Sequence, residues 1–332
     1  MTLNQLRFLI AIADANLNIT LAAGRVHATQ PGLSKQLKQL EDELGFQLFT
    51  RKGKSLSAIT PAGGEVIARA RVVIDEVRNI KALAANLRQA TQGSLKLGTT
   101  HTQARFVLPP VLAKVRSKFP DLALRLVPGS TGELTEQLKN NQLDLIVTST
   151  SGSKPEHVIA LPAYRWDRVI VVPRHHPLAR LRHAVKLVDL APYPLLTYEP
   201  VNKGNSSIAN AFAHVGLKPN FALTALDADV LKANVKAGLG VGILAPMALE
   251  SADLEQLVVI DAKHLFPTCI TWIELNPGRV IPQYVRELIS SFAPHVTKSH
   301  LDDILRGDSV HFDYGSLPNW PLPEPFSRLR AA

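Results

Sequence analysis

Hydroxyl and amide side chains gather in the stretch TTHTQAR at residues 99–105. The stretch overlaps the end of a strand-like segment, LKLGTT, and leads into a predicted helix at about residues 110–119. Free backbone N–H groups and the helix dipole both favour an anion at the start of a helix, and neutral donors suffice for a tetrahedral oxyanion such as sulfate. The same hydroxyls could simply cap the helix, and spacing alone leaves both interpretations open.

A second group of polar and basic side chains suits nucleic acid. On one face of a predicted helix, side chains have the length and polarity to meet base edges and phosphates in a major groove. The candidate contacts are Thr29, Gln30, Pro31, Ser34, Lys35 and Lys38 on this helix, and Arg51, Lys52 and Lys54 in a glycine-containing turn beyond it. The alternative is a solvated basic surface without a DNA partner.

Two short helices must position this face. Apolar residues recur at helical spacing at residues 22–26 and again at 33–44, with a tight break between, which is typical of a helix-turn-helix. Thr20 is the expected N-cap of the first helix and Thr29 that of the second, and Gly45 is placed to end the second. Residues 3–14 predict a further amphipathic helix beneath the pair.

The sequence contains no convincing catalytic or metal-binding motif. Glycines at positions 238, 240 and 242 lack the spacing of a dinucleotide loop and precede a strand instead of a helix. His175 and His176 have no partners at metal-ligand spacing. We therefore expect no enzyme activity, no catalytic residue, no metal and no cofactor.

Composition narrows the class of protein further. The 332 residues are enough for two or three domains, and the net charge of +9 with a pI near 9.7 suits a polyanionic partner without identifying it. The single cysteine, Cys269, cannot form an intrachain disulfide, which favours a reducing cytoplasm. We found neither a secretory pattern at the N-terminus nor a run of the roughly 18 apolar residues that span a bilayer, so no membrane partner is expected.

Residues 61–90 predict a long linker helix after a DNA-binding domain at residues 1–60. Apolar positions alternate at spacings of four and three, which gives a seam of period 3.5. The seam consists of Val66, Ala70, Val73, Val77, Ile80, Ala84 and Leu87. Such a seam needs a covering helix, so we expect pairing with a second copy of the chain. The alternative is a helix that lies on its own domain.

Beyond a predicted hinge at residues 91–94, strand and helix signals alternate, which is typical of an α/β domain that binds ligands at the carboxyl ends of its strands. We expect this domain at residues 91–300. Lobe I should span about 91–163 and 267–300, lobe II about 164–266, and an irregular tail should occupy 301–332.

The N-terminal segment from Leu3 to Gly63 resembles the winged helix-turn-helix of the LysR-type transcriptional regulators. The resemblance includes the AA, QP, LS, LE, LG and LF pairs and the ending TPAG. It implies that the second helix is the recognition helix, that the linker helix forms the dimer, and that a two-lobed, periplasmic-binding-protein-like α/β domain holds an effector between its lobes. Effector-domain contacts would then build a tetramer.

Further segments, up to about residue 298, resemble the CysB subgroup, whose members regulate sulfur assimilation. They are TTHTQAR, LPAYRW, HPLA, YPLLTY, TALDADVLKANVKAGLGVGILAPMAL and FAPHVT. In that subgroup the effector site holds sulfate or a related small ligand. The positions that match it are Thr100, Thr102, Gln103, Ser149 in place of a common threonine, and Trp166, which is expected on lobe II.

One segment departs from the subgroup. After Tyr198 the chain reads EPVNKG, where the subgroup has an aromatic and glycine-rich segment with a threonine donor. Asn202 or Lys203 falls nearest to that donor. If Lys203 faces the cleft, its positive charge favours a more anionic ligand, whereas a solvent-facing Lys203 has no such effect.

The resulting expectation is a cytoplasmic LysR-type regulator of sulfur metabolism that binds operator DNA as a homodimer or homotetramer. Its effector would be sulfate, thiosulfate, O-acetylserine or adenosine phosphosulfate, and RNA polymerase would be a further partner. Two alternatives stay open: a solute-binding module with a basic N-terminal domain and no sequence-specific DNA binding, and a nonspecific chromosome-associated protein.

Overall fold

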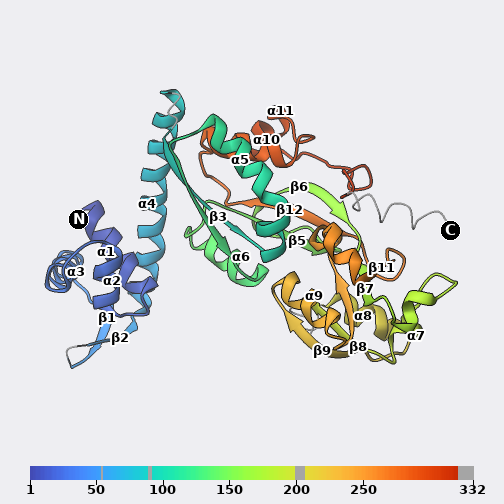
Figure 1. Cartoon of the computed structure of the whole chain (residues 1–332). Helices are drawn as coiled ribbons and strands as arrows, with labels where there is room; N and C mark the ends of the chain where they lie inside the picture. Colours follow the sequence, from blue (N-terminus) through green and yellow to red (C-terminus); the bar gives the residue numbers. More distant parts are fainter. Residues whose placement is uncertain (54, 89–91, 199–205, 321–332) are drawn as a thin grey trace. The chain divides into compact units, whose positions relative to one another are not determined.

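The structure, a computed structural model, describes residues 1–53, 55–88, 92–198 and 206–320 (Figure 1). The chain forms two compact units, Met1–Arg88 and Gln89–Ala332. Within the described part of the chain, no helix combines the length and the apolar character that a membrane crossing requires.

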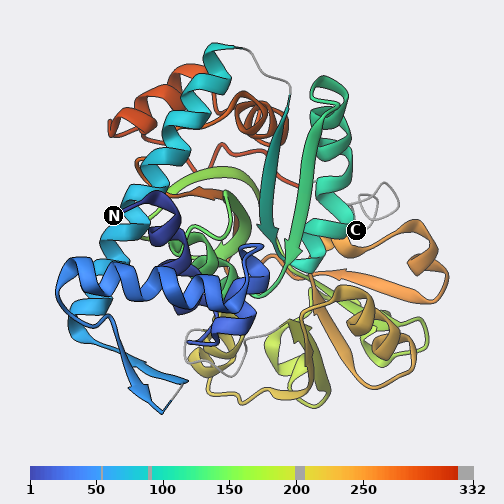
Figure 2. The same cartoon turned by 90° about the vertical axis from the view of Figure 1, so that its left-hand side faces the viewer.

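The N-terminal unit consists of three helices, a hairpin and a long helix. Their bounds are α1 Leu3–Asp14, α2 Ile19–Arg25, α3 Gln30–Leu44, β1 Phe49–Lys52, β2 Ser55–Ile59 and α4 Pro61–Leu87. The core between α1, α2 and α3 includes Leu9, Ala22 and Leu33, which are almost fully buried. The antiparallel hairpin β1–β2 projects from these helices in both views (Figures 1 and 2). This unit confirms the expected winged helix-turn-helix.

Polar caps set the ends of these helices, with one difference from the expected positions. Asn18 caps α2, because its side-chain oxygen accepts a hydrogen bond of 2.9 Å from the Leu21 backbone N–H. The prediction that Thr20 caps this helix is wrong, because Thr20 lies inside the helix, which begins at Ile19. Thr29 caps α3 as expected, and Gly45 ends that helix at a φ of 78°, a left-handed conformation that favours glycine.

The long helix α4 differs in character between its two halves. Its first half packs against α1 of the same chain and buries Ile67, Ala70 and Ile74. Its second half leaves Ile80, Leu83 and Leu87 exposed by 59%, 51% and 78%. The first half of the seam therefore lies partly on its own domain, whereas the second half presents an uncovered apolar surface.

The C-terminal unit contains two five-stranded sheets. The first sheet, with its helices, is called lobe I here and has the order β4-β3-β5-β12-β6. Its strands are β3 Gly93–Thr99, β4 Leu122–Pro128, β5 Leu145–Ser151, β6 Ile159–Trp166 and β12 Cys269–Leu275, and its helices are the π-helix η1 Gln103–Val107, α5 Leu108–Lys118, α6 Thr131–Lys139, α10 Gln283–Phe292 and α11 Lys298–Arg306. Because β4, β3 and β5 are parallel, their carboxyl ends meet at one edge of the sheet.

The second sheet, with its helices, is called lobe II and has the order β11-β7-β10-β8-β9. Its strands are β7 Val169–Pro173, β8 Pro194–Tyr198, β9 Asn220–Ala225, β10 Val241–Leu244 and β11 Leu257–Asp261. Its helical segments are η2 Pro177–Arg180, α7 Leu187–Leu190, α8 Ser207–His214, α9 Ala228–Lys236, η3 Pro246–Ala248 and η4 Ser251–Glu255. Apolar clusters on both faces of this sheet form its core. The two sheets confirm the expected two-lobed α/β fold.

The chain crosses between the lobes twice, and the first crossing lies later than expected. Strand β6 continues to Trp166, which pairs with Cys269 in the lobe I sheet. Placing Trp166 on lobe II was therefore wrong, because the pairing with β12 continues past the expected boundary at residue 163. The strand from residue 269 and helix α10 return to lobe I as expected.

The end of the described chain is more ordered than the predicted irregular tail. Helix α11 spans the boundary drawn at residue 300. Further along, the Trp320 backbone N–H donates a 2.8 Å hydrogen bond to the Arg165 carbonyl, and the Trp320 ring packs on Tyr164 at a centroid distance of 5.0 Å. This segment therefore lies along the edge of β6. The contact joins residues that are distant in sequence, and the segment has no local periodic pattern that predicts it.

Candidate effector cleft and DNA-binding face

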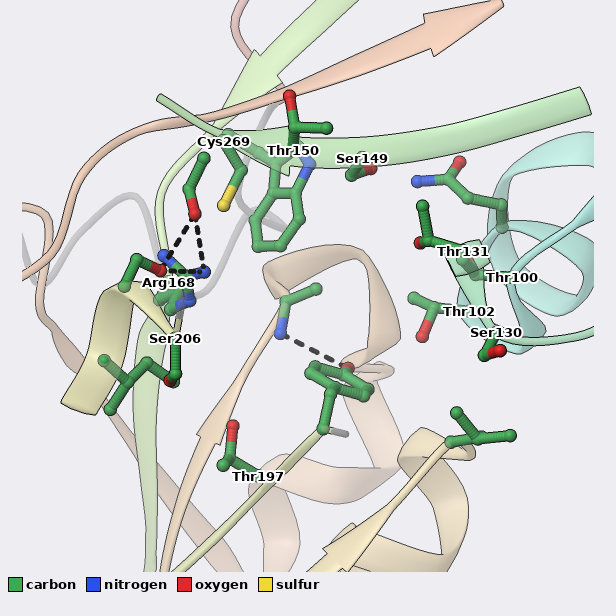
Figure 3. A pocket seen from close by; sticks show the side chains of 18 of the residues that line it. Thr100, Thr102, Ser130, Thr131, Ser149, Thr150, Arg168, Thr197, Ser206 and Cys269 are labelled. Carbon is green, nitrogen blue, oxygen red and sulfur yellow. Dashed lines mark hydrogen bonds between the residues drawn. The ribbon is translucent and has the colours of Figure 1, made fainter. Parts of the chain in front are cut away.

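A cavity of about 480 Å³ lies between lobes I and II (Figure 3). Hydroxyl side chains dominate its lining. They belong to Thr100, Thr102, Ser130, Thr131, Ser149, Thr150, Ser151, Thr197, Tyr198, Ser206 and Ser207. Among the described lining residues, Arg168 is the only charged one. The volume falls within the range of small-molecule sites, about 300–1,000 Å³.

The lobe I end of the cavity is formed where parallel strands finish. Thr100 and Thr102 follow β3, and Ser130 and Thr131 follow β4 at the start of α6. Ser130 is the N-cap of α6, and its hydroxyl donates a 2.8 Å hydrogen bond to Glu133. Thr100, Thr102, Ser130 and Thr131 appear together on one side of the close-up (Figure 3). Because Glu133 already accepts the Ser130 backbone N–H and hydroxyl, the hydroxyls that this end offers to an anion are those of Thr100, Thr102 and Thr131.

Gln103 is held in a defined orientation beside these hydroxyls. It is only 2% exposed, and its side-chain oxygen accepts a 2.6 Å hydrogen bond from the Tyr164 hydroxyl. Burial raises the pKa of Tyr164, so its phenol stays protonated and keeps donating. The amide nitrogen of Gln103 is consequently the end that remains for a ligand.

Ser149 and Trp166 meet at a shared partner, Thr271 on β12. The Ser149 and Thr271 hydroxyl oxygens lie 2.9 Å apart, and the Trp166 indole N–H donates to the Thr271 oxygen over 3.2 Å. An indole has a single N–H donor, so in this arrangement Trp166 offers its ring to the cavity and not a hydrogen bond. The structure thus brings Thr100, Thr102, Gln103, Ser149 and Trp166, five of the residues predicted to bind an effector, to the lining of one cavity.

The other end of the cavity contains Arg168, which was not predicted from the sequence. One terminal guanidinium nitrogen donates to Ser207 over 3.0 Å and to Ser151 over 3.5 Å, and the other donates to the Pro267 carbonyl over 3.2 Å. The Ser151 hydroxyl also donates to Ser207 over 2.8 Å. The sequence signal that could have identified Arg168 is its position two residues after the LPAYRW segment, at the crossing between the lobes.

Tyr198 lies on the lobe II side of the cavity. Its hydroxyl oxygen accepts a hydrogen bond of 3.4 Å from the Ala245 backbone N–H. Burial raises the pKa of this phenol, so it stays neutral and can donate. Ile208, Leu226 and Met247 complete the lining with apolar surface. The remaining predicted effector residues, Asn202 and Lys203, lie outside the described residues.

The predicted DNA contacts on α3 are accessible. Gln30, Pro31, Lys35 and Lys38 are exposed, and Ser34 is half-buried. The Gln30 amide nitrogen donates to the Ser34 hydroxyl over 3.3 Å, whereas no described carboxylate pairs with Lys35 or Lys38. Two basic side chains therefore remain available on this face.

The hairpin contributes less free charge than expected. Arg51 forms an ion pair of 3.1 Å with Glu41, a buried carboxylate that also accepts the Leu48 backbone N–H over 2.9 Å. Arg51 therefore fixes the hairpin to α3 as well as carrying charge. Lys52 is exposed, and Lys54 lies outside the described residues.

Comparisons with known proteins match both units. Residues 88–296 match the LysR substrate binding domain, and residues 3–64 match the bacterial regulatory helix-turn-helix proteins of the LysR family. The chain is 38% identical over 299 residues to the HTH-type transcriptional regulator CysB of Haemophilus influenzae, which covers 90% of this chain and 92% of that protein. It is 35% identical over 285 residues to the regulator cbl of Escherichia coli K12, covering 86% of this chain and 90% of that protein.

A solved structure is similar as well. The crystal structure of the cofactor-binding domain of the Cbl transcriptional regulator is 32% identical and has a TM-score of 0.60, covering 65% of this chain and 94% of that one. A helix-turn-helix unit together with a two-lobed ligand-binding domain defines a DNA-binding regulator that responds to small molecules. The chain belongs to the LysR family of transcriptional regulators, in the subgroup that contains CysB and Cbl. The family consists of regulators and not enzymes, which confirms the expectation of no catalysis.

Proposed function

We propose that this chain regulates genes of sulfur metabolism, namely cysteine biosynthesis and sulfate or sulfonate assimilation, in response to a sulfate-like oxyanion or another sulfur metabolite. The observation that carries the proposal is the cluster of neutral donors at Thr100, Thr102 and Gln103, at the lobe I end of the cleft. The similarity to CysB and Cbl supports the assignment to sulfur metabolism.

The chemistry of this end suits a tetrahedral oxyanion. Such an anion accepts hydrogen bonds in several directions, and hydroxyls and an amide approach it here from three segments of lobe I. A fully ionised anion such as sulfate has no proton to donate and only accepts hydrogen bonds, so neutral hydroxyl and amide donors suit it. Thr100, Thr102, Gln103 and Ser149 are the proposed ligands, and Trp166 lines the same space with its ring.

The DNA contacts are proposed for α3 and the hairpin. Lys35 and Lys38 are exposed beside Gln30, so they can reach phosphates while the amide and Ser34 meet base edges. Thr29 and Pro31 set the start of the helix that enters the groove. Arg51, Lys52 and Lys54 would contact flanking phosphates.

The proposed working unit is a homodimer or homotetramer in the cytoplasm, where operator DNA is found. The uncovered apolar side chains at Ile80, Leu83 and Leu87 support pairing through the linker helix. Two recognition helices then read two half-sites one helical turn apart. RNA polymerase is a further proposed partner at the promoter.

Effector binding changes operator binding only through a difference in affinity between two arrangements of the protein. The cleft lies between two lobes, so a ligand that contacts both favours one lobe arrangement over another. The direction of regulation, activation or repression, then depends on which arrangement the operator prefers.

A promoter-binding titration tests the proposal. The full chain is titrated onto labelled promoter DNA alone and with sulfate, thiosulfate, O-acetylserine or adenosine phosphosulfate. We expect salt-sensitive binding that survives competition with unrelated DNA and that one or more of these compounds changes severalfold.

Other outcomes correspond to other functions. No salt-sensitive binding to any upstream fragment would revive the solute-binding module, and equal competition by unrelated DNA would indicate a nonspecific chromosome-associated protein. Sequence-specific binding that none of the four compounds changes would contradict the sulfur effector alone.

Lys203 is proposed to contribute to effector binding and to favour more anionic ligands, and Asn202 is the alternative donor in this segment. A Lys203→Ala variant should lose affinity for thiosulfate and adenosine phosphosulfate in calorimetry, because a full positive charge near the anion is removed. Unchanged affinity for sulfate, thiosulfate and adenosine phosphosulfate would remove Lys203 from the site.

A further inference from the structure

The cleft has two polar ends, and only one of them belongs to the proposed oxyanion site. In the close-up, Thr100, Thr102, Ser130 and Thr131 lie on one side of the cavity, and Arg168 lies on the opposite side (Figure 3). Both ends line the same cavity. Trp166, Ile208 and Met247 add apolar surface to the lining of the same cavity.

The cavity is larger than a sulfate ion requires. A water molecule accounts for about 30 Å³ of liquid volume, so a five-atom oxyanion fills a small part of about 480 Å³. Pockets of this size commonly enclose an organic molecule with polar groups at fixed positions and apolar surface between. The lining of this cavity likewise combines polar groups with apolar surface.

Arg168 has the properties of an anion-binding group. Its guanidinium uses three of its five N–H donors on Ser151, Ser207 and Pro267, which leaves two of the five without an acceptor among the described residues. Across the described residues, no carboxylate lies within salt-bridge distance of it. A half-buried guanidinium without a counter-ion binds carboxylate, sulfonate or phosphate groups well, because their oxygens match its fork of donors.

The two serines beside Arg168 belong to different lobes. Ser151 ends β5 in lobe I and Ser207 begins α8 in lobe II, and their hydroxyls lie 2.8 Å apart. The Ser151 hydroxyl uses its single proton on Ser207, so an acidic group bound at Arg168 can accept a hydrogen bond from the Ser207 hydroxyl. The ligand then joins a chain of hydrogen bonds that links lobe II to lobe I through the two serines.

We propose that the cleft binds an elongated organic ligand with two acidic groups, an oxyanion at the Thr100 end and a second acidic group at Arg168. This inference rests on the proposed oxyanion site and identifies the chemical class of the ligand that fills the rest of the cleft. An inorganic oxyanion then occupies one end only and binds more weakly than the two-ended ligand.

Calorimetry on the full chain tests this with two series of probes. The first is a set of ω-sulfocarboxylates, from sulfoacetate to 5-sulfopentanoate, and the second is the alkanesulfonates of the same lengths, which lack the carboxylate. We expect one sulfocarboxylate to bind at least about tenfold tighter than its matched alkanesulfonate, the gain that charge-assisted hydrogen bonds provide.

Variants of Arg168 and Arg165 test which side chain causes the tighter binding of sulfocarboxylates. Arg168→Gln should remove the gain and leave affinity for the alkanesulfonates within about twofold. Arg165→Gln is the matched control, because it removes the same charge three residues earlier at a side chain that does not line the cavity, and it should keep the gain. Arg168→Lys, which keeps the charge but loses the fork, should retain an intermediate preference.

Three results would overturn the inference. These are equal affinity of the wild-type chain for both series at every length, a gain that survives Arg168→Gln, and equal weakening of both series by Arg168→Gln, which indicates a purely structural role. If Arg168→Gln fails to fold, the wild-type comparison alone still decides. Calorimetry without DNA also separates this inference from the regulatory proposal, which fails only if operator binding does not respond.

Discussion

The DNA-binding face and the effector cleft are built from the chain in opposite ways. Every candidate DNA contact lies between residues 29 and 54, on one helix and the hairpin that follows it. The cleft draws on segments of both lobes that are spread from Thr100 to Cys269. A local site tolerates changes elsewhere, whereas an assembled site depends on the sheets that bring its parts together.

The largest expected effect concerns the assembly of two DNA-binding faces. Replacing Ile80 and Leu83 by glutamate places charges on the exposed apolar surface of α4, and we expect loss of the dimer and a drop in operator affinity of about 100-fold or more. Analytical ultracentrifugation measures the loss of the dimer, and a mobility-shift assay measures the operator affinity.

Val188→Glu is the control, since it charges an exposed apolar residue of lobe II at 58% exposure. Sulfate affinity should not change in either variant, because the cleft lies within one chain. A double variant that keeps both the subunit number and the operator affinity of the wild type would contradict the linker as the dimer element.

A smaller loss should follow from removing single charges on the DNA face. Lys35→Ala or Lys38→Ala should weaken operator binding by about tenfold and reduce the slope of log affinity against log salt by about 1. Lys218→Ala, an exposed lysine of lobe II, should leave both unchanged. An unchanged salt slope in both α3 variants would show that neither lysine contacts a phosphate.

The cleft should respond to loss of a hydroxyl with the DNA face unaffected. Thr100→Val preserves the side-chain shape and removes one donor, so sulfate affinity should fall by about fivefold to tenfold in calorimetry. Thr135→Val is the matched control, because its hydroxyl donates to the Thr131 carbonyl within α6 and does not line the cavity. Equal losses in the two variants would indicate a general effect on lobe I.

The smallest effect concerns the strand that supports the cleft. Glu274 on β12 is 2% exposed and accepts a hydrogen bond from Thr148, and burial raises its pKa above the ordinary value of 4.5. At a pH between 4.5 and that raised pKa, the unfolded chain has released this proton and the folded chain retains it. The unfolding free energy therefore falls as pH rises through this window.

Glu274→Gln removes this penalty, so its melting temperature should exceed that of the wild type by a few degrees at pH 8 and match or fall below it at pH 4. Glu136→Gln on the surface of α6 should show no such trend. A wild-type advantage that grows with pH would reverse the sign and contradict a protonated Glu274.

The difference between the two regions also explains what the sequence could predict. The recognition helix was predictable because its cap, apolar spacing and outward face are local, although Asn18 and not Thr20 caps the preceding helix. The placement of Thr100, Thr102 and Gln103 at a ligand site depended on the family resemblance, because spacing alone left them open as helix caps. The two sheets themselves followed from the alternation of strand and helix signals.

Arg168 and the lobe of Trp166 were not predictable from local pattern. The position of Arg168 and the assignment of Trp166 to lobe I both depend on where β6 stops pairing with β12. This pairing joins residues about a hundred positions apart. The contact between Trp320 and Tyr164 is of the same kind. Sequence reasoning failed where the determining contact was distant and had no periodic signal of its own.

An oxyanion bound in the cleft should change how the full chain binds its operator. Footprinting of the promoter with and without sulfate, for the wild type and for Thr100→Val, measures this. We predict that sulfate changes the protected length for the wild type and that Thr100→Val needs about fivefold to tenfold more sulfate for the same change. A footprint that never responds to sulfate, or that responds at the same concentration in both proteins, would contradict it.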